Sequence, residues 1–135
     1  MNNITYMNDK KKINLRNPNW NYTELVLAIE LYRSSKTKPP GKTSIQVKTL
    51  SSLLRLNALS QKKIISNTYR NCSGVSLELQ NLRRLDPEYK GKGLKPAGAL
   101  AKEIWNRFDS LKKISKEADI VRDDIEKRFN ILREI

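Results

Sequence analysis

The sequence contains no histidine and a single cysteine, Cys72, among its 135 residues. Without histidine there is neither an imidazole general base nor an imidazole metal ligand, so a histidine-dependent nuclease is excluded. One cysteine cannot form an internal disulfide, and it has no histidine with which to share a metal ion. We therefore expect Cys72 to be a half-buried free thiol, and we expect no metal or other cofactor.

Long apolar runs are also absent. No stretch approaches the roughly 20 apolar residues that a membrane-spanning helix needs. Residues 1–12 are polar and end in three lysines, unlike a secretory signal. The sequence therefore predicts a cytoplasmic protein rather than a membrane or exported one, with enough length for one compact domain and an appendage.

Positive charge, by contrast, is abundant and unevenly placed. The chain has 27 Lys and Arg against 14 Asp and Glu, a net charge of +13. Residues 1–98 hold 18 basic and 6 acidic residues, whereas residues 99–135 hold 9 and 8. Such a concentration of basic residues is typical of proteins that contact phosphates in a salt-dependent manner. An acidic protein partner or an anionic membrane surface remains an alternative.

The N-terminal part of the chain divides into a polar segment and a helix. Residues 1–19 show no periodicity and predict a mobile basic arm. From Trp20 the apolar residues recur at helical spacing and predict a first helix over 23–34, with Asn21 or Thr23 as its cap.

Two prolines and a glycine in residues 36–42 predict a loop after this helix. A second helix follows, with Thr43 or Ser44 as its N-cap. Its expected core residues are Ile45, Leu50, Leu53, Leu54 and Leu56. We expect a turn at residues 57–60, then a short helix or an extended piece at 61–68.

Residues 72–85 predict an amphipathic helix with Ser73 as its N-cap. At 100° per residue, one face gathers Val75, Leu79 and Leu82. The other face gathers side chains able to donate to phosphates or base edges, and Leu77 falls near it: Ser73, Ser76, Gln80, Arg83 and Arg84. Asp86 and Pro87 end the helix, and residues 88–98 form a loop rich in lysine and glycine.

The last third of the chain predicts two further helices. The first begins near Ala99, with core residues Leu100, Ile104, Trp105 and Phe108, and a break is expected at residues 109–110. Beyond it an apolar stripe with dense mixed charge between its members predicts a long amphipathic helix. Its members are Leu111, Ile114, Ala118, Val121, Ile125, Phe129 and Leu132. We expect either a partner helix, as in a homodimer through residues 111–135, or a further domain to cover this stripe.

Two motifs that resemble catalytic sequences do not support catalysis. Asp86, Glu88 and Lys90 imitate the Glu-x-Lys half of a metal-dependent nuclease, but they fall in a loop where no strands bring carboxylates together. Residues 41–43 imitate the end of a phosphate-binding loop, yet the required first glycine is replaced by Lys36. We therefore assign no catalytic residue.

Three segments together resemble a known family, the N-terminal domain of bacterial HNH restriction endonucleases, including those specific for modified cytosine. The resemblance covers roughly residues 20–121 and lies in WNYTELVLAIELY (20–32), YRNCSGVSLELQNLRRLDPEYKGKG (69–93) and KEIWNRF (102–108). Cys72 stands where the family usually has proline, and Glu78 where lysine is common. The resemblance implies a helical DNA-reading specificity module that precedes a nuclease domain in the family.

The sequence thus predicts an all-α protein: a basic arm (1–19), a compact bundle of three to four helices with a helix-turn-helix-like recognition helix (20–109), and a long C-terminal helix (110–135). The expected ligand is duplex DNA, with or without methylated cytosine. The expected base-reading residues are Ser73, Ser76, Gln80 and Arg83. The expected phosphate-binding residues are Lys62, Lys63, Arg70, Asn71, Arg84, Lys90, Lys92 and Lys95.

Two other functions remain open at this point. The chain is also consistent with a stand-alone DNA-binding regulator or anti-restriction factor that dimerises through the C-terminal helix. A third hypothesis is a helical adaptor that uses this helix to bind a protein partner.

Overall fold

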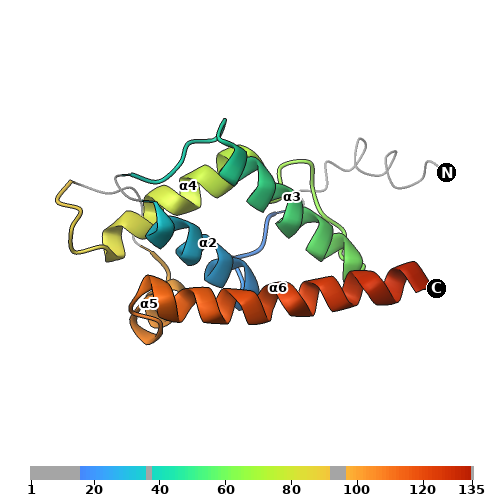
Figure 1. Cartoon of the computed structure of the whole chain (residues 1–135). Coiled ribbons are helices and arrows are strands. Elements are labelled where there is room, and N and C mark those ends of the chain that lie inside the picture. The colour runs from blue at the N-terminus through green and yellow to red at the C-terminus, as the bar shows by residue number, and fades with distance from the viewer. Residues whose placement is uncertain (1–15, 36–37, 92–96, 135) are drawn as a thin grey trace.

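The computed structural model describes residues 16–35, 38–91 and 97–134, with side chains up to Asn130 (Figure 1). In these residues the fold is all-α, as predicted, and contains no strand. Its five α-helices are Tyr22–Ser34 (α2), Ile45–Ser60 (α3), Cys72–Leu82 (α4), Ala99–Arg107 (α5) and Leu111–Glu134 (α6), and a 3₁₀ turn, Arg83–Leu85 (η1), follows α4. None of these helices is long and apolar enough to span a membrane.

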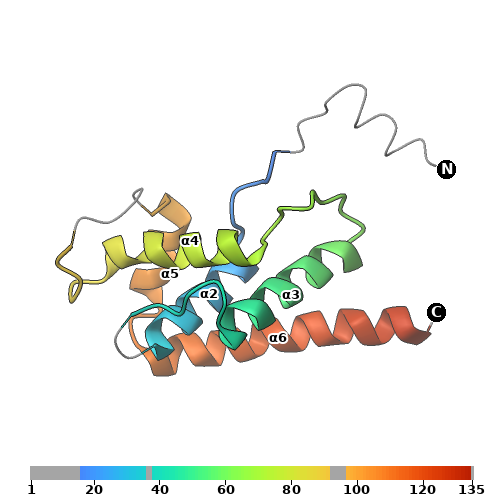
Figure 2. The same cartoon turned by 90° about the horizontal axis from the view of Figure 1, so that it is seen from above.

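The helices form three layers around α2. Helix α4 lies on one side of the molecule and α6 on the opposite side, with α2 and α3 between them (Figures 1 and 2). Helix α2 packs against each of the other four helices. Because α4 is an outer layer, one of its faces is turned away from the core.

Helix α2 is buried around most of its surface, as expected of a central helix. Its buried apolar residues are Leu25, Val26, Leu27, Ala28, Ile29 and Tyr32. The predicted cap at Asn21 is confirmed: the Asn21 carboxamide oxygen accepts from the Glu24 amide at 2.9 Å, and the Glu24 carboxylate accepts from the Asn21 amide at 3.0 Å. This reciprocal capping box fixes where the helix begins.

Helix α3 begins after Ser44, one of the two predicted caps, but it differs from the prediction in length and in phase. It continues through the turn expected at 57–60, because Asn57 is buried with its carboxamide oxygen accepting from Arg128 of α6 at 2.6 Å. The core face consists of Val47, Leu50, Leu54 and Ala58. Ile45 and Leu56, both expected in the core, are 71% and 51% exposed.

A tight reversal ends α3 at Lys62, whose φ of 61° lies in the left-handed region. The Lys63 amide donates to the Ala58 carbonyl at 3.1 Å and the Lys62 amide to the Leu59 carbonyl at 2.9 Å, which is the Schellman pattern. Residues 61–71 then reach α4 without the short helix considered for 61–68. This connection is longer than the three- or four-residue turn of a helix-turn-helix. Helices α3 and α4 are consecutive and pack against each other, as the two helices of that motif do, but the tight turn between them is absent.

Helix α6 belongs to the same core as the preceding helices. The predicted break at 109–110 is present, and α6 packs against α2 and α3. Its fully or nearly buried residues are Ile114, Ala118, Val121 and Ile125. We expected a partner helix or another domain to cover this stripe, and for these four residues that expectation is wrong. Residues before and after the break at 109–110 belong to the same hydrophobic core.

Candidate nucleic-acid interface

Helix α4 sorts its side chains onto the two predicted faces. Val75, Leu79 and Leu82 are 0% exposed and pack into the core. The N-cap is Asn71 instead of the predicted Ser73, because the Asn71 carboxamide oxygen accepts from the Gly74 amide at 2.7 Å. Asn71, expected to bind phosphate, thus uses its side-chain oxygen to hold the start of the helix.

The outward face of α4 carries polar side chains without partners. Ser73 is exposed, Ser76 and Gln80 are half-buried, and Arg84 of the following η1 turn is exposed. None of these four side chains makes a hydrogen bond or ion pair with the described residues. These groups are therefore available to an external ligand. They lie along a helix about 16 Å long.

Arg83 sits at the edge of this face. Its guanidinium stacks over the Tyr89 ring, 4.6 Å from the ring centroid. Lys38 lines the same small hollow of about 210 Å³ as Arg83 and Tyr89, although it is far from them in the sequence. Nothing local in the sequence relates Lys38 to α4, and Asp86 and Glu88 also line this hollow.

The remaining predicted phosphate contacts lie in the segments that flank α4. Lys62 and Lys63 are exposed in the segment that leads into its N-terminal end, and Lys90 is exposed in the segment that follows η1. Lys92 and Lys95, also expected to bind phosphate, lie outside the described residues. Cys72 at the start of α4 is a half-buried free thiol, as predicted.

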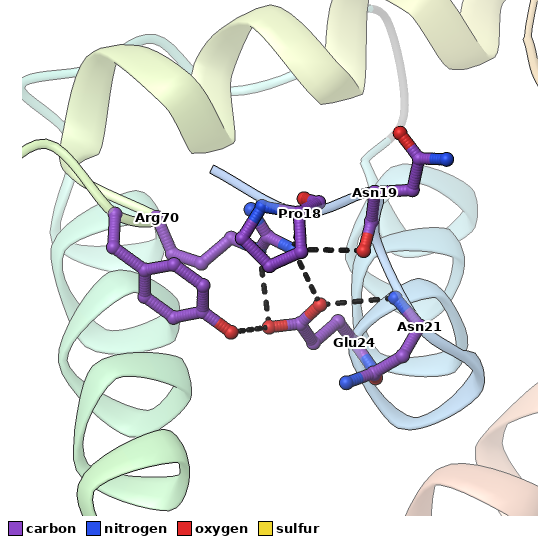
Figure 3. A network of polar contacts seen from close by, with 6 residues as sticks. Pro18, Asn19, Asn21, Glu24 and Arg70 are labelled. Carbon is purple, nitrogen blue, oxygen red and sulfur yellow. Dashed lines mark hydrogen bonds and ion pairs between the residues drawn. The ribbon is translucent and has the colours of Figure 1, made fainter. Parts of the chain in front are cut away.

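Arg70 does not belong to this surface, and its assignment as a phosphate contact is wrong. Its side chain is 4% exposed and forms an ion pair with the buried carboxylate of Glu24 at 2.9 Å. The guanidinium also donates to the carbonyl oxygens of Pro18 at 2.9 Å and Asn19 at 3.1 Å (Figure 3). A phosphate would have to displace these partners and enter the protein interior.

The buried pair connects three segments of the chain. The Tyr69 hydroxyl donates to Glu24 at 2.6 Å, and burial together with this hydrogen bond raises the pKa of Tyr69 to about 12. The Trp20 ring lies 4.8 Å from the Arg70 guanidinium. Arg70 itself has a φ of 47°, an unfavourable left-handed conformation that these contacts hold in place. The network fixes residues 69–71 and with them the start of α4.

A groove of about 820 Å³ runs beside the outward face of α4. Its walls come from α4, from the start of α5 and from residues 17–20. Glu78 lines this groove, and burial raises the pKa of its carboxyl group while a hydrogen bond with Asn81 opposes the shift. The groove residues from α4 are Gly74, Leu77, Glu78 and Asn81.

We predict that Glu78→Gln stabilises the protein at neutral pH. The carboxyl pKa is higher in the folded than in the unfolded chain, so folding favours the protonated form. The free energy of unfolding therefore falls as pH rises above 4.5, the pKa of this carboxyl group in the unfolded chain. Thermal melting of both proteins should give similar midpoints below pH 4.5 and a higher midpoint for Glu78→Gln at pH 7. A lower midpoint for the variant at pH 7 would contradict this account.

Asp86, the first acidic residue after α4, has structural partners. The Asp86 carboxylate accepts from the Tyr32 hydroxyl at 2.8 Å and from the Glu88 amide at 2.9 Å. Burial and the hydrogen bond to Asp86 raise the pKa of the Tyr32 hydroxyl group. Across the described ranges, no group of three His, Cys, Asp or Glu side chains is placed to hold a metal ion.

Comparison with protein-family models, curated proteins and solved structures finds no match for this chain.

Proposed function

We propose that this chain binds duplex DNA through the outward face of α4. The observation that carries the proposal is the set of unpartnered polar side chains on that face, next to flanking segments rich in exposed lysine and arginine. Residues 45–91, which include α3, α4 and the segments that flank α4, hold eight Lys and Arg against three Asp and Glu, whereas α6 holds seven against six. The α4 side of the molecule is therefore the side that attracts a polyanion.

The dimensions of α4 suit the major groove. An α-helix fits the roughly 12 Å width of this groove, and side chains on its outward face then reach base edges. Gln80 carries an amide that pairs with adenine through two hydrogen bonds, and Ser73 and Ser76 donate to or accept from either strand. Arg84 and the lysines of the flanking segments contact phosphates and set the register of the helix on the duplex.

Lys62 offers a test of the proposal, because its charge and its backbone conformation can be changed separately. A lysine in the left-handed region costs about 1–2 kcal/mol relative to the usual backbone, and glycine would avoid this cost. The Schellman turn that ends α3 holds Lys62 in this conformation. Lys62 is exposed in the segment that leads into α4, where its ammonium group can contact a phosphate.

The resemblance to HNH restriction endonucleases supports a more specific proposal, in which this chain is the DNA-reading module of such an enzyme. In that role it selects the site, with or without methylated cytosine, and has no catalytic residue itself. A stand-alone regulator or anti-restriction factor would use the same α4 surface. The hypothesis of a helical adaptor is less favourable, because the apolar stripe of α6 that would bind the partner is buried within the chain.

Two substitutions at Lys62 separate its charge from its conformation. Lys62→Gly should raise the free energy of unfolding by about 0.5–1 kcal/mol, because relief of left-handed strain outweighs the greater freedom of glycine in the unfolded chain. The same variant should bind duplex DNA more weakly and lower the slope of log affinity against log salt by about one. Denaturant unfolding and fluorescence anisotropy at several salt concentrations measure the two effects.

Lys62→Gln is the matched control, since it removes the charge and keeps the left-handed conformation. It should weaken DNA binding as much as Lys62→Gly does, without the gain in stability. If both variants bind DNA with the parent's affinity and salt slope, Lys62 does not contact phosphate.

A further inference from the structure

Leu77 interrupts the polar outward face of α4. It is 53% exposed and lies on the same face as Ser73 and Gln80, whose side chains have no partner among the described residues. A leucine offers neither donor nor acceptor, so it adds nothing to phosphate binding and forms no hydrogen bond with a base edge. Its apolar surface must therefore meet an apolar group if the face contacts DNA.

Leu77 faces the groove beside α4, whose lining is mixed: Glu78 and Asn81 are polar, and the start of α5 is apolar. Leu100 of α5, which is 37% exposed, lines the same groove. The wall next to Leu100 is formed by Gly98 and Ala99, and the space where a side chain of Gly98 would begin is open. Small residues on this wall leave room for a ligand group between α4 and α5.

We propose that Leu77, which shares the groove with Leu100, forms a contact site for the C5-methyl group of a pyrimidine in the major groove. The C5-methyl is the apolar group that base edges present in this groove, and aliphatic side chains are its usual contacts. Thymine carries this group, and so does cytosine methylated at C5. This inference rests on the proposed function, because it requires α4 to lie in the major groove.

Removal of single methyl groups from a bound duplex tests the site. The probe is the tightest duplex selected by the full chain from a randomised pool. It is resynthesised with each thymine in turn replaced by uracil, which pairs identically but lacks the methyl. In a second arm each cytosine in turn is replaced by 5-methylcytosine. For the parent we expect one position at which the methyl strengthens binding about fourfold, the factor for burying one methyl-sized group.

Leu77→Ala should remove this methyl dependence and keep the affinity for the methyl-free duplex. Its side chain is half exposed, so the variant should fold, which thermal melting checks. Ile120→Ala is the matched control: it removes similar exposed apolar surface from α6, on the opposite side of the molecule, and should leave the methyl dependence intact.

The uracil and 5-methylcytosine arms tell the two sources of the methyl group apart. A parent that binds the duplex but is insensitive to every methyl would overturn this inference and leave the proposed function standing. Methyl dependence that persists in Leu77→Ala would overturn it as well. A parent that binds no duplex would overturn the proposed function and this inference with it.

Discussion

Arg70→Ala is expected to lower the free energy of unfolding by about 3–5 kcal/mol, because it leaves the Glu24 carboxylate buried without its cation. The substitution also removes the donors that hold the carbonyl oxygens of Pro18 and Asn19 against the start of α2. Urea unfolding followed by circular dichroism measures the loss. Any effect of this variant on DNA binding should follow from lost structure, not from a lost phosphate contact.

Arg84→Ala is the matched control for Arg70→Ala. Arg84 is exposed and has no partner among the described residues, so its removal should change stability by less than about 0.5 kcal/mol and weaken DNA binding. In the double variant Glu24→Leu/Arg70→Met neither charge remains unpaired, and part of the stability should return. If Arg70→Ala were as stable as the parent, the buried network would not hold the fold together.

Ile125→Ala is expected to cost about 2–5 kcal/mol of stability, since it creates a cavity where α6 packs on the core. Ile120→Ala on the same helix should cost less than about 0.5 kcal/mol, because Ile120 is 56% exposed. Unfolding curves of the two variants, with sedimentation of each, test the packing of α6. If Ile125→Ala kept the parent's stability and instead dissociated a dimer, the stripe would be an intermolecular surface.

The helix boundaries that sequence analysis predicted well depend on local chemistry. Asn21 and Ser44 cap helices because their short side chains reach amides three residues ahead, and this spacing is visible in the sequence. Asp86 and Pro87 end the 3₁₀ turn after α4 for an equally local reason, because proline lacks an amide hydrogen. The two faces of α4 were likewise predictable, since periodicity alone separates them.

The errors concern residues whose partners are distant in the sequence. Arg70 is consistent with a phosphate contact until the fold brings Glu24 beside it, and Asn57 indicates a turn until Arg128 of α6 satisfies its carboxamide. Similarly, the stripe of α6 indicates a dimer interface until α2 and α3 cover it. In each case a tertiary contact that no local pattern specifies decides whether a side chain is structural or available to a ligand.

The same distinction reduces the predicted DNA surface to fewer residues. Arg70 and Asn71 hold the start of α4 in place, and the face they position retains Ser73, Ser76, Gln80 and Arg84. Rigid support of this kind favours sequence discrimination, because side chains fixed on a packed helix lose little freedom on binding. The central claim is therefore that α4 reads the duplex and that Gln80 contributes base contacts.

Competition binding to a randomised duplex library, with and without methylated cytosine, tests this claim most directly. The parent should bind with a steep salt dependence and a sequence or modification preference. Gln80→Ala should lose about 1–3 kcal/mol of that discrimination and keep its nonspecific affinity. Lys90→Ala should instead weaken binding to all sequences alike and lower the salt slope by about one. A Gln80→Ala variant with the parent's full preference, or a parent that does not bind duplex DNA, would contradict the account.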